Sequence, residues 1–401
     1  MSSRWAAMYA ERGLQTPTNP HAIPPVRANS VVQFDAETVK SDAAQARLLV
    51  HHRFPQLIDR FLNYKRQHGS ATEKRVYANM TAGQEIARLF RNRPLAFLDG
   101  TDTTKLRDGR VIHSAAHLWD AVGTDREGII TLDEYLSYEE IMLSSFIGCS
   151  GPSFFINDGN RHNSAHPGYP GTFEERGVIV GLVGARFERL EHMDANIVLT
   201  KHKEDSEVTK MILDFLQVQK LEGSGFDENV YIARMKIPIL LLLSEAQWRA
   251  QAESKKAYLY VVGLGLGVWQ HDSSQPEYYI RAWCQILKEY KGNFPNIGII
   301  EFAYINVTPM YQGVLKDIAK RDGIEVRFTK RAPAAKLKGM ESEHLLVLSY
   351  AWDANSYPGN EYWMGHLSAS GDPAAASMST IAEIHNPEIN PRIWQSYENP
   401  S

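Results

Sequence analysis

The chain has 401 residues, enough to bury a large core and to form two or three domains. Hydrophobic residues make up 43% and charged residues 22%, which excludes a disordered chain or a coiled coil and is typical of a globular protein. Lys and Arg number 43 against 47 Asp and Glu, and the formal net charge of −4 disfavours a nucleic-acid binder that works through bulk charge.

Cysteine content and hydropathy predict a cytoplasmic protein. Only Cys149 and Cys284 are present, so there is no disulfide framework and no CxxC pair for zinc or redox chemistry. The amino terminus lacks the apolar core of a signal peptide, and the longest apolar stretch, residues 237–243, is far shorter than the ~18 residues of a membrane span. We therefore expect neither a membrane nor a nucleic-acid partner.

The first 150 residues are predicted to form an arm and a helical extension. Residues 1–36 end in a polar, proline-rich segment, which favours an extended arm on the surface. Residues 37–150 are expected to pack on the core as helices: apolar positions recur at helical spacing from Pro55 to about Arg66, and Thr81 with Gln84 matches a capping box.

Residues 151–390 have the alternating pattern of an α/β domain, and residues 391–401 form a tail. Apolar runs predict strands at 154–156, 178–183, 258–262, 297–302, 324–328 and 345–350. Helical segments are expected at 208–215, 277–290 and 311–320. This alternation implies a largely parallel sheet, in which ligands bind beyond the carboxyl ends of the strands.

Two loops at predicted strand ends carry binding chemistry. Asn157, Asp158, Asn160 and Arg161 offer amide, carboxylate and guanidinium groups to the hydroxyls of a sugar or nucleotide, although a tight Asn/Gly turn explains them equally well. The second loop, residues 263–269, contains Gly263, Gly265, Gly267 and Trp269. Its glycines let backbone N–H groups approach a diphosphate, although a lone glycine-rich turn is a weak signal.

A third loop carries three carboxylates, Asp353, Glu361 and Asp372, among aromatic residues after the strand at 345–350. Paired carboxylates suit glycosidic chemistry, because one group handles a proton while another stabilises positive charge on the sugar carbon. The alternative is a solvated loop in which Asp372, before Pro373, caps a helix at 374–381. No HExxH or other ligand set predicts a metal, and we expect no cofactor.

Five segments stand out together: FINDGNRHN (155–163), GVIVGLVGARFE (177–188), GLGLGVW (263–269), SYAWDANSYPGNEYW (349–363) and SGDPAAA (370–376). In this combination the chain resembles, from about Glu134 to Asn390, the macrodomain-like ADP-ribosylarginine hydrolase family that includes the bacterial effector MavL. The resemblance implies a three-layer α/β/α fold with a mixed, mostly parallel sheet. It also implies an ADP-ribose ligand, an arginine-ADP-ribosylated protein substrate and hydrolysis of the ribose–guanidinium N-glycosidic bond.

The resemblance also implies roles for particular residues. The segment with Asp353, Asn355, Gly359, Asn360 and Glu361 is similar to the ribose loop of ordinary macrodomains. It stands near the carboxyl end of the chain instead of the amino end, which indicates a permuted strand order. Asp353 and Glu361 would face the scissile bond with support from Asp372, and Asn355 and Asn360 would bind the distal ribose.

Three other functions use the same loops. A non-catalytic reader of ADP-ribosylated proteins would bind without releasing ADP-ribose. A hydrolase of O-linked ADP-ribose or poly(ADP-ribose) would need a proton donor, which Glu361 could supply. A sugar-nucleotide or NAD-handling enzyme would also suit the glycine loop. Release of ADP-ribose from arginine alone would separate the expected hydrolase from all three.

Overall fold

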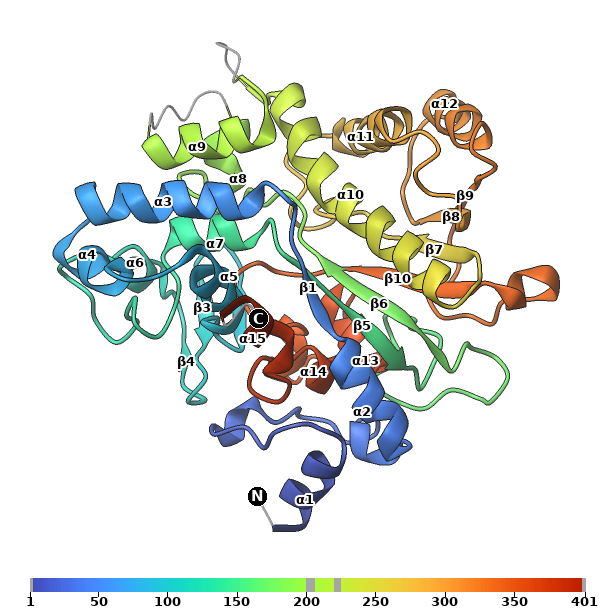
Figure 1. The fold of residues 1–401 in the computed structure, drawn as a ribbon, viewed down its shortest axis with the longest axis horizontal. Helices are drawn as coiled ribbons and strands as arrows, with labels where there is room; N and C mark the ends of the chain where they lie inside the picture. Colours follow the sequence, from blue (N-terminus) through green and yellow to red (C-terminus); the bar gives the residue numbers. More distant parts are fainter. Residues whose placement is uncertain (1–2, 200–205, 220–224, 399–401) are drawn as a thin grey trace.

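The computed structural model describes residues 3–199, 206–219 and 225–398, and its centre is a seven-stranded sheet (Figure 1). The strand order is β1-β5-β6-β10-β7-β8-β9; β6, β10, β7, β8 and β9 run parallel to one another, and β1 and β5 are antiparallel to their neighbours. The strands are β1 (Arg47–Leu49), β5 (Gly148–Phe154), β6 (Arg176–Leu182), β7 (Ala257–Val261), β8 (Ile297–Ala303), β9 (Glu325–Thr329) and β10 (Leu345–Ala351).

Helices cover both faces of the sheet, and the core lies between these layers (Figure 1). One face carries α10 (Glu228–Ala252), α11 (Gln275–Glu289) and α12 (Pro309–Lys320). The opposite face carries the short helices α13 (Asp372–Met378) and α14 (Ile381–Ile384). The parallel strands are almost continuously apolar because both of their faces are buried.

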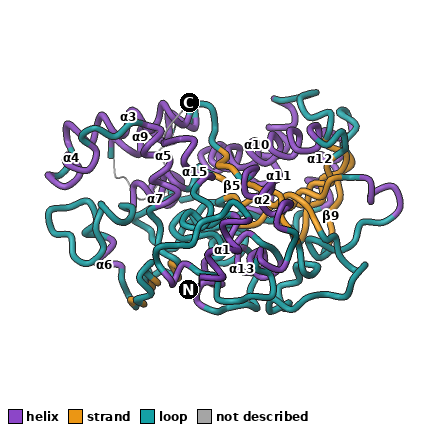
Figure 2. Tube along the Cα trace, turned by 60° about the horizontal axis from the view of Figure 1, so that its bottom comes forward, coloured by secondary structure: helices purple, strands orange, loops and turns teal. Residues whose placement is uncertain are grey.

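The remaining helices surround the sheet: most lie beside it, in the half of the molecule that Figure 2 shows without strands of the main sheet, and others pack against β5 and β1. They are α1 (Ser3–Glu11), α2 (Ala36–Gln45), α3 (Phe54–His68), α4 (Ala71–Tyr77), α5 (Ala82–Arg91), α6 (Ala116–Trp119), α7 (Tyr138–Ser144), α8 (Asp194–Val198), α9 (Glu207–Leu216) and α15 (Arg392–Glu398). A small antiparallel sheet adds β2 (Ala96–Leu98), β3 (Thr103–Lys105) and β4 (Val111–Ile112).

The model confirms most of the predicted elements, including five of the six strands. The capping box of α5 is present, because Thr81 Oγ1 accepts from the Gln84 N–H at 3.2 Å and the Gln84 side chain accepts from the Thr81 N–H at 2.9 Å. The first strand differs: β5 precedes the apolar run and reaches only Phe154 of it. The sequence also did not predict α10, whose apolar segment contains Pro238.

Residues 1–150 were predicted to form a surface arm and a helical extension, but they also contribute a strand to the main sheet and buried residues to the core. Strand β1 completes one side of the main sheet by pairing with β5. Two short 3-10 turns, η1 (Pro20–Ala22) and η2 (Val31–Gln33), shape the proline-rich segment, and its residues Asn29, Ser30 and Val31 are buried. Among the described residues, no helix combines the length and the apolar character that a membrane span requires.

Candidate active site

Three adjacent parallel strands bring three loops to one edge of the sheet. Because β6, β10 and β7 are neighbours with the same direction, the loops after Leu182, Ala351 and Val261 leave from the same side. The loop after β6 and the loop after β7 touch each other at glycines, Gly184 and Gly265. Gly265 has φ +71°, and a Cβ there would lie 2.7 Å from the Ala185 carbonyl oxygen, so only glycine fits without strain.

The three predicted carboxylates come together at this edge. Asp353 follows β10, Glu361 lies in the 3-10 turn η4 (Asn360–Met364), and Asp372 is the first residue of α13. Burial raises the pKa of Asp372 well above its usual range, and the charges of Asp353 and Glu361 raise it further. Burial and the neighbouring negative charges thus both favour the neutral form of this carboxyl group.

Asp353 has a pKa suited to proton transfer at neutral pH. Burial raises its pKa to about 7, the Arg186 guanidinium opposes that rise, and the charges of Glu188 and Glu361 add to it. The residue nevertheless keeps partial solvent access. A group with these properties exchanges a proton with water or a substrate near the working pH of most enzymes.

Asp372 is not the N-cap of α13, which was the alternative explanation of this residue from the sequence. The N-cap of α13 is Gly371, and the Asp372 carboxylate instead accepts the Gly359 N–H at 3.2 Å. Gly359 has φ +99°, and a Cβ there would lie 3.0 Å from the Cβ of Ala376. Asp372 thus holds the turn that carries Glu361 against α13.

The two asparagines of the loop are placed differently. The Asn360 amide donates to Asp353 and to the Phe97 carbonyl at 3.2 Å, and its oxygen accepts the Phe97 N–H at 2.8 Å. Asn360 therefore orients Asp353 and joins it to β2. Asn355 is fully buried, and within the described part of the chain neither of its amide atoms has a hydrogen-bond partner.

Arg186 and Glu188 belong to the site, although sequence reasoning did not select them. Arg186 is 4% exposed, its Nε donates to Glu188 at 2.7 Å, and it stacks between Phe97 and Trp269 at 5.3 and 5.1 Å from their ring centroids. One terminal guanidinium nitrogen lacks a partner among the described residues. Both residues directly follow the predicted strand at 178–183, so the strand-end rule could have found them.

The arginine loop is fixed by a buried ion pair. Arg234 Nε donates to Asp194 at 2.9 Å, and the other Asp194 oxygen accepts the Arg186 N–H at 2.8 Å. Beyond it the glycine loop becomes accessible: Gly263 is partly exposed, Gly267 is exposed, and Trp269 packs partly against the core. The edge therefore combines a partly exposed glycine loop, in which Gly265 is buried, with carboxylates and one buried guanidinium.

The Asn157–Asn163 loop leaves from the opposite edge, because β5 is antiparallel and Phe154 pairs with Arg176 at the start of β6. Asn157 is buried and stabilises its own loop, donating to the His166 carbonyl at 3.0 Å and accepting the Gly159 N–H at 2.9 Å. Asp158 accepts the Asn160 N–H, and the side chains of Asn160 and Arg161 are exposed. The structure does not bring these four residues into contact with the carboxylates.

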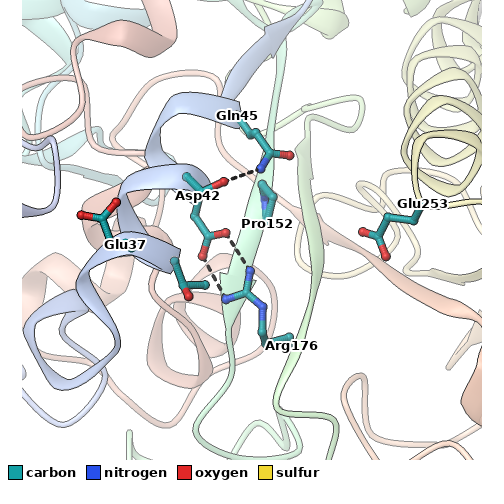
Figure 3. A pocket seen from close by; sticks show the side chains of 8 residues that line it. Glu37, Asp42, Gln45, Pro152, Arg176 and Glu253 are labelled. Carbon is teal, nitrogen blue, oxygen red and sulfur yellow. Dashed lines mark hydrogen bonds and ion pairs between the residues drawn. The ribbon is translucent and has the colours of Figure 1, made fainter.

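A surface pocket of about 380 Å³ lies away from this site (Figure 3). Arg176, which lines it, begins β6 and thus marks the edge opposite Asp353. Its guanidinium binds both oxygens of Asp42, at 3.0 and 2.7 Å, so the positive charge of the pocket is already paired, and the other charged residues that line it, Glu37 and Glu253, are acidic. Within the ranges that the structure describes, no group of three or more His, Cys, Asp or Glu side chains is arranged to hold a metal ion.

Comparison with known proteins places this arrangement in a family. A family model described as ADP-ribosylhydrolase MavL-like matches residues 14–211 and 200–399, so the likeness extends well before Glu134. Two proteins of Drosophila melanogaster, named ADP-ribosylarginine hydrolases CG2909 and CG3568, are each 32% identical over 88% of this chain. The matches cover 78% and 77% of those proteins. The chain belongs to the MavL-like ADP-ribosylhydrolase family.

Proposed function

We propose that this protein is an ADP-ribosylarginine hydrolase that cleaves the N-glycosidic bond between ribose and a protein arginine. The names of the two Drosophila relatives support this activity. The observation that carries it is the group of carboxylates at one sheet edge, which includes Asp353 with a pKa of about 7. A cationic guanidinium leaving group favours such carboxylates, since they bind it and stabilise the positive charge that develops on the sugar carbon.

The reaction needs one proton acceptor and one guanidinium partner. In the proposal, Asp353 accepts a proton as water adds to the ribose carbon, and the carbon–nitrogen bond breaks. The same proton then passes to the departing nitrogen, so that free ADP-ribose and an arginine guanidinium result. Glu361 binds the guanidinium of the target arginine. Asp372 acts through the turn at Gly359, because its carboxyl is buried and directed at that backbone.

Binding of ADP-ribose is assigned to the neighbouring loops. The glycine loop, with Gly263, Gly265 and Gly267, offers backbone N–H groups to the diphosphate, and the unpartnered nitrogen of Arg186 donates to a phosphate oxygen. Asn355 is assigned to a ribose hydroxyl because its amide has no partner among the described residues, and since the side chain is fully buried, the loop around it must open to admit the ribose. Trp269 forms a wall of this site by stacking on Arg186.

We also propose a macrodomain-like, three-layer architecture with permuted strand order for residues 151–390. Helices on both sheet faces support the three layers, and the position of β10, the last strand of the chain, between β6 and β7 supports the permutation. The boundaries at 36, 150 and 390 and the cytoplasmic location stay predictions from sequence.

The test is release of free ADP-ribose from proteins modified on arginine, and separately on glutamate or serine. We expect release from arginine only, and a loss of at least about 100-fold in Glu361→Gln, since a charge that binds the leaving group is removed. Glu325→Gln, an exposed carboxylate at the start of β9, is the matched control and should keep full turnover. Binding of ADP-ribose without release from any substrate would indicate a reader and refute the proposal.

A further inference from the structure

The proline-rich amino-terminal segment contacts the two elements that carry the carboxylates. Asn29 is 2% exposed and lies between η4 and α13. Its amide nitrogen donates to the carbonyls of Ala376 and, at 2.7 Å, Ser379, at the carboxyl end of α13. Its oxygen accepts the hydroxyl of Tyr362, the neighbour of Glu361, at 3.3 Å. One side chain thus joins the Glu361 turn to the helix that begins at Asp372.

Two further contacts tie the same segment to the carboxylate loop. Ala22 packs in a small buried cluster with Leu95, Tyr357 and Trp363. The carboxylate of Glu388 accepts the Tyr357 hydroxyl at 3.2 Å and the backbone N–H of Asn19 at 3.4 Å. The segment therefore also packs near this loop at positions that precede Asn29 in the chain.

The position of Asn29 itself is fixed by its neighbours. Ser30 Oγ donates to one oxygen of the buried Glu383 at 2.8 Å, and the Val31 N–H donates to the other at 2.6 Å. Tyr9 of α1 donates to the same carboxylate at 2.5 Å. Glu383 lies in α14, directly after α13. The amino-terminal arm, η4 and α13 are therefore connected to one another through hydrogen bonds.

We propose that Asn29 is a positioning residue that holds the turn carrying Glu361 against α13, and so fixes the position of Glu361 for hydrolysis. The inference rests on the proposed function, and it assigns a catalytic purpose to the amino-terminal arm. Misplacing a reacting group by about 1 Å costs on the order of 100-fold in rate, so a hydrogen-bonded tie of this kind has a large effect on turnover.

The contacts of Asn29 also predict which kinetic constant changes. They go to η4 and α13, whereas the diphosphate is assigned to the glycine loop after β7, and no described hydrogen bond of Asn29 reaches that loop. Loss of the tie should therefore lower kcat more than it raises KM, because Glu361 is displaced while the diphosphate contacts that hold the substrate stay in place.

The decisive variant is Asn29→Asp, which keeps the shape of the side chain but cannot donate from the position of the amide nitrogen. The carbonyls of Ala376 and Ser379 would then face a carboxylate oxygen, which breaks the tie. We expect kcat to fall at least about tenfold, with KM within about twofold of wild type.

Asn390→Asp is the matched control. Asn390 is fully buried, and its amide donates to two backbone carbonyls, of Ala43 at 3.0 Å and Ile384 at 2.9 Å, without contacting η4 or α13. The substitution should lower thermal stability to a similar extent while leaving kcat of the folded protein unchanged. An equal loss of kcat in both variants would overturn the proposal, because general destabilisation would then explain it.

Two further measurements keep the test decisive if Asn29→Asp folds poorly or the wild-type protein is inactive. Tyr362→Phe removes one hydroxyl from the tie and should lower kcat by about threefold to fivefold with unchanged KM. Hydrogen exchange in residues 359–379 should increase in Asn29→Asp and not in Asn390→Asp, whatever the reaction is. Inactive wild-type protein with this exchange pattern would refute the proposed function alone; unchanged exchange, or unchanged kcat in Tyr362→Phe, would refute the role of Asn29.

Discussion

Replacing Asp353 with asparagine tests both the chemistry and the electrostatics of the site. The substitution preserves the shape of the side chain, and an amide oxygen can still accept from Asn360. It removes the carboxylate that the proposed mechanism uses as proton acceptor. We therefore expect turnover to fall at least about 100-fold, because general base catalysis contributes about 10²- to 10⁴-fold.

The same variant should be more stable than wild type above neutral pH. In the folded protein the pKa of Asp353 is raised from 3.8 to about 7, mainly by burial. Between these pH values the unfolded chain has lost its proton while the folded protein keeps it, so this residue lowers stability as pH rises through the interval. The cost is fully present above pH 7 and amounts to about 4 kcal/mol, at 1.36 kcal/mol per pKa unit.

The assay is the melting temperature of wild type and Asp353→Asn from pH 4 to pH 8, beside their rates of ADP-ribose release. The stability advantage of the variant should be negligible near pH 4, grow through pH 5 and 6, and level off near pH 7 to 8. Asn360→Asp is unsuitable as a control because Asn360 contacts the same group. The exposed Glu325→Gln is a control of opposite sign: the ion pair with Arg327 lowers the pKa of Glu325, so this variant should lose stability relative to wild type as pH rises from the acid end. A stability advantage of Asp353→Asn that does not depend on pH would refute the raised pKa of Asp353. Full turnover in this variant would refute its role as the proton acceptor.

Two other substitutions follow from the geometry of the loops. Glu188→Gln removes a negative charge that raises the pKa of Asp353, so the acid limb of the pH–rate profile should move to lower pH, by up to about 1 pH unit. An upward shift would contradict this. Gly265→Ala places a Cβ against Ala185 at a positive φ, and calorimetry should find that ADP-ribose binds at least about tenfold more weakly. Gly267→Ala is the control, because a Cβ at Gly267 meets no atom within 4 Å. An equal loss of affinity in both variants would show that the effect is not specific to Gly265.

The sequence predicted the carboxylate loop because its position follows from a simple rule. The run at 345–350 is apolar enough to be a buried strand, and ligand groups gather beyond the carboxyl ends of parallel strands. Both conditions hold for β10, so Asp353 was placed at the correct edge. The same rule covers Arg186 and Glu188, which follow β6 and therefore lie at the same edge of the sheet as the candidate carboxylates.

The rule failed for the Asn157–Asn163 loop because strand direction is absent from the hydrophobic pattern. A buried antiparallel strand and a buried parallel strand both appear as short apolar runs, and β5 runs opposite to β6. The contribution of Asn29 was equally out of reach, because its partners lie more than 300 positions away in the chain. Single-sequence periodicity describes neighbours along the chain, and these contacts are set by tertiary packing.

The order of the sheet explains why residues 151–390 should not work alone, although their alternating strand and helix pattern predicts an α/β domain. A fragment starting at residue 151 begins inside β5 and lacks β1, which pairs with it. It also lacks Phe97, which bonds Asn360, and Asn29, which joins η4 to α13. We expect this fragment to aggregate or to remain inactive on arginine-linked substrate, while residues 14–399, the range of the family match, keep activity. A soluble, fully active fragment 151–390 would show that the amino-terminal contacts are dispensable and would contradict the site described above.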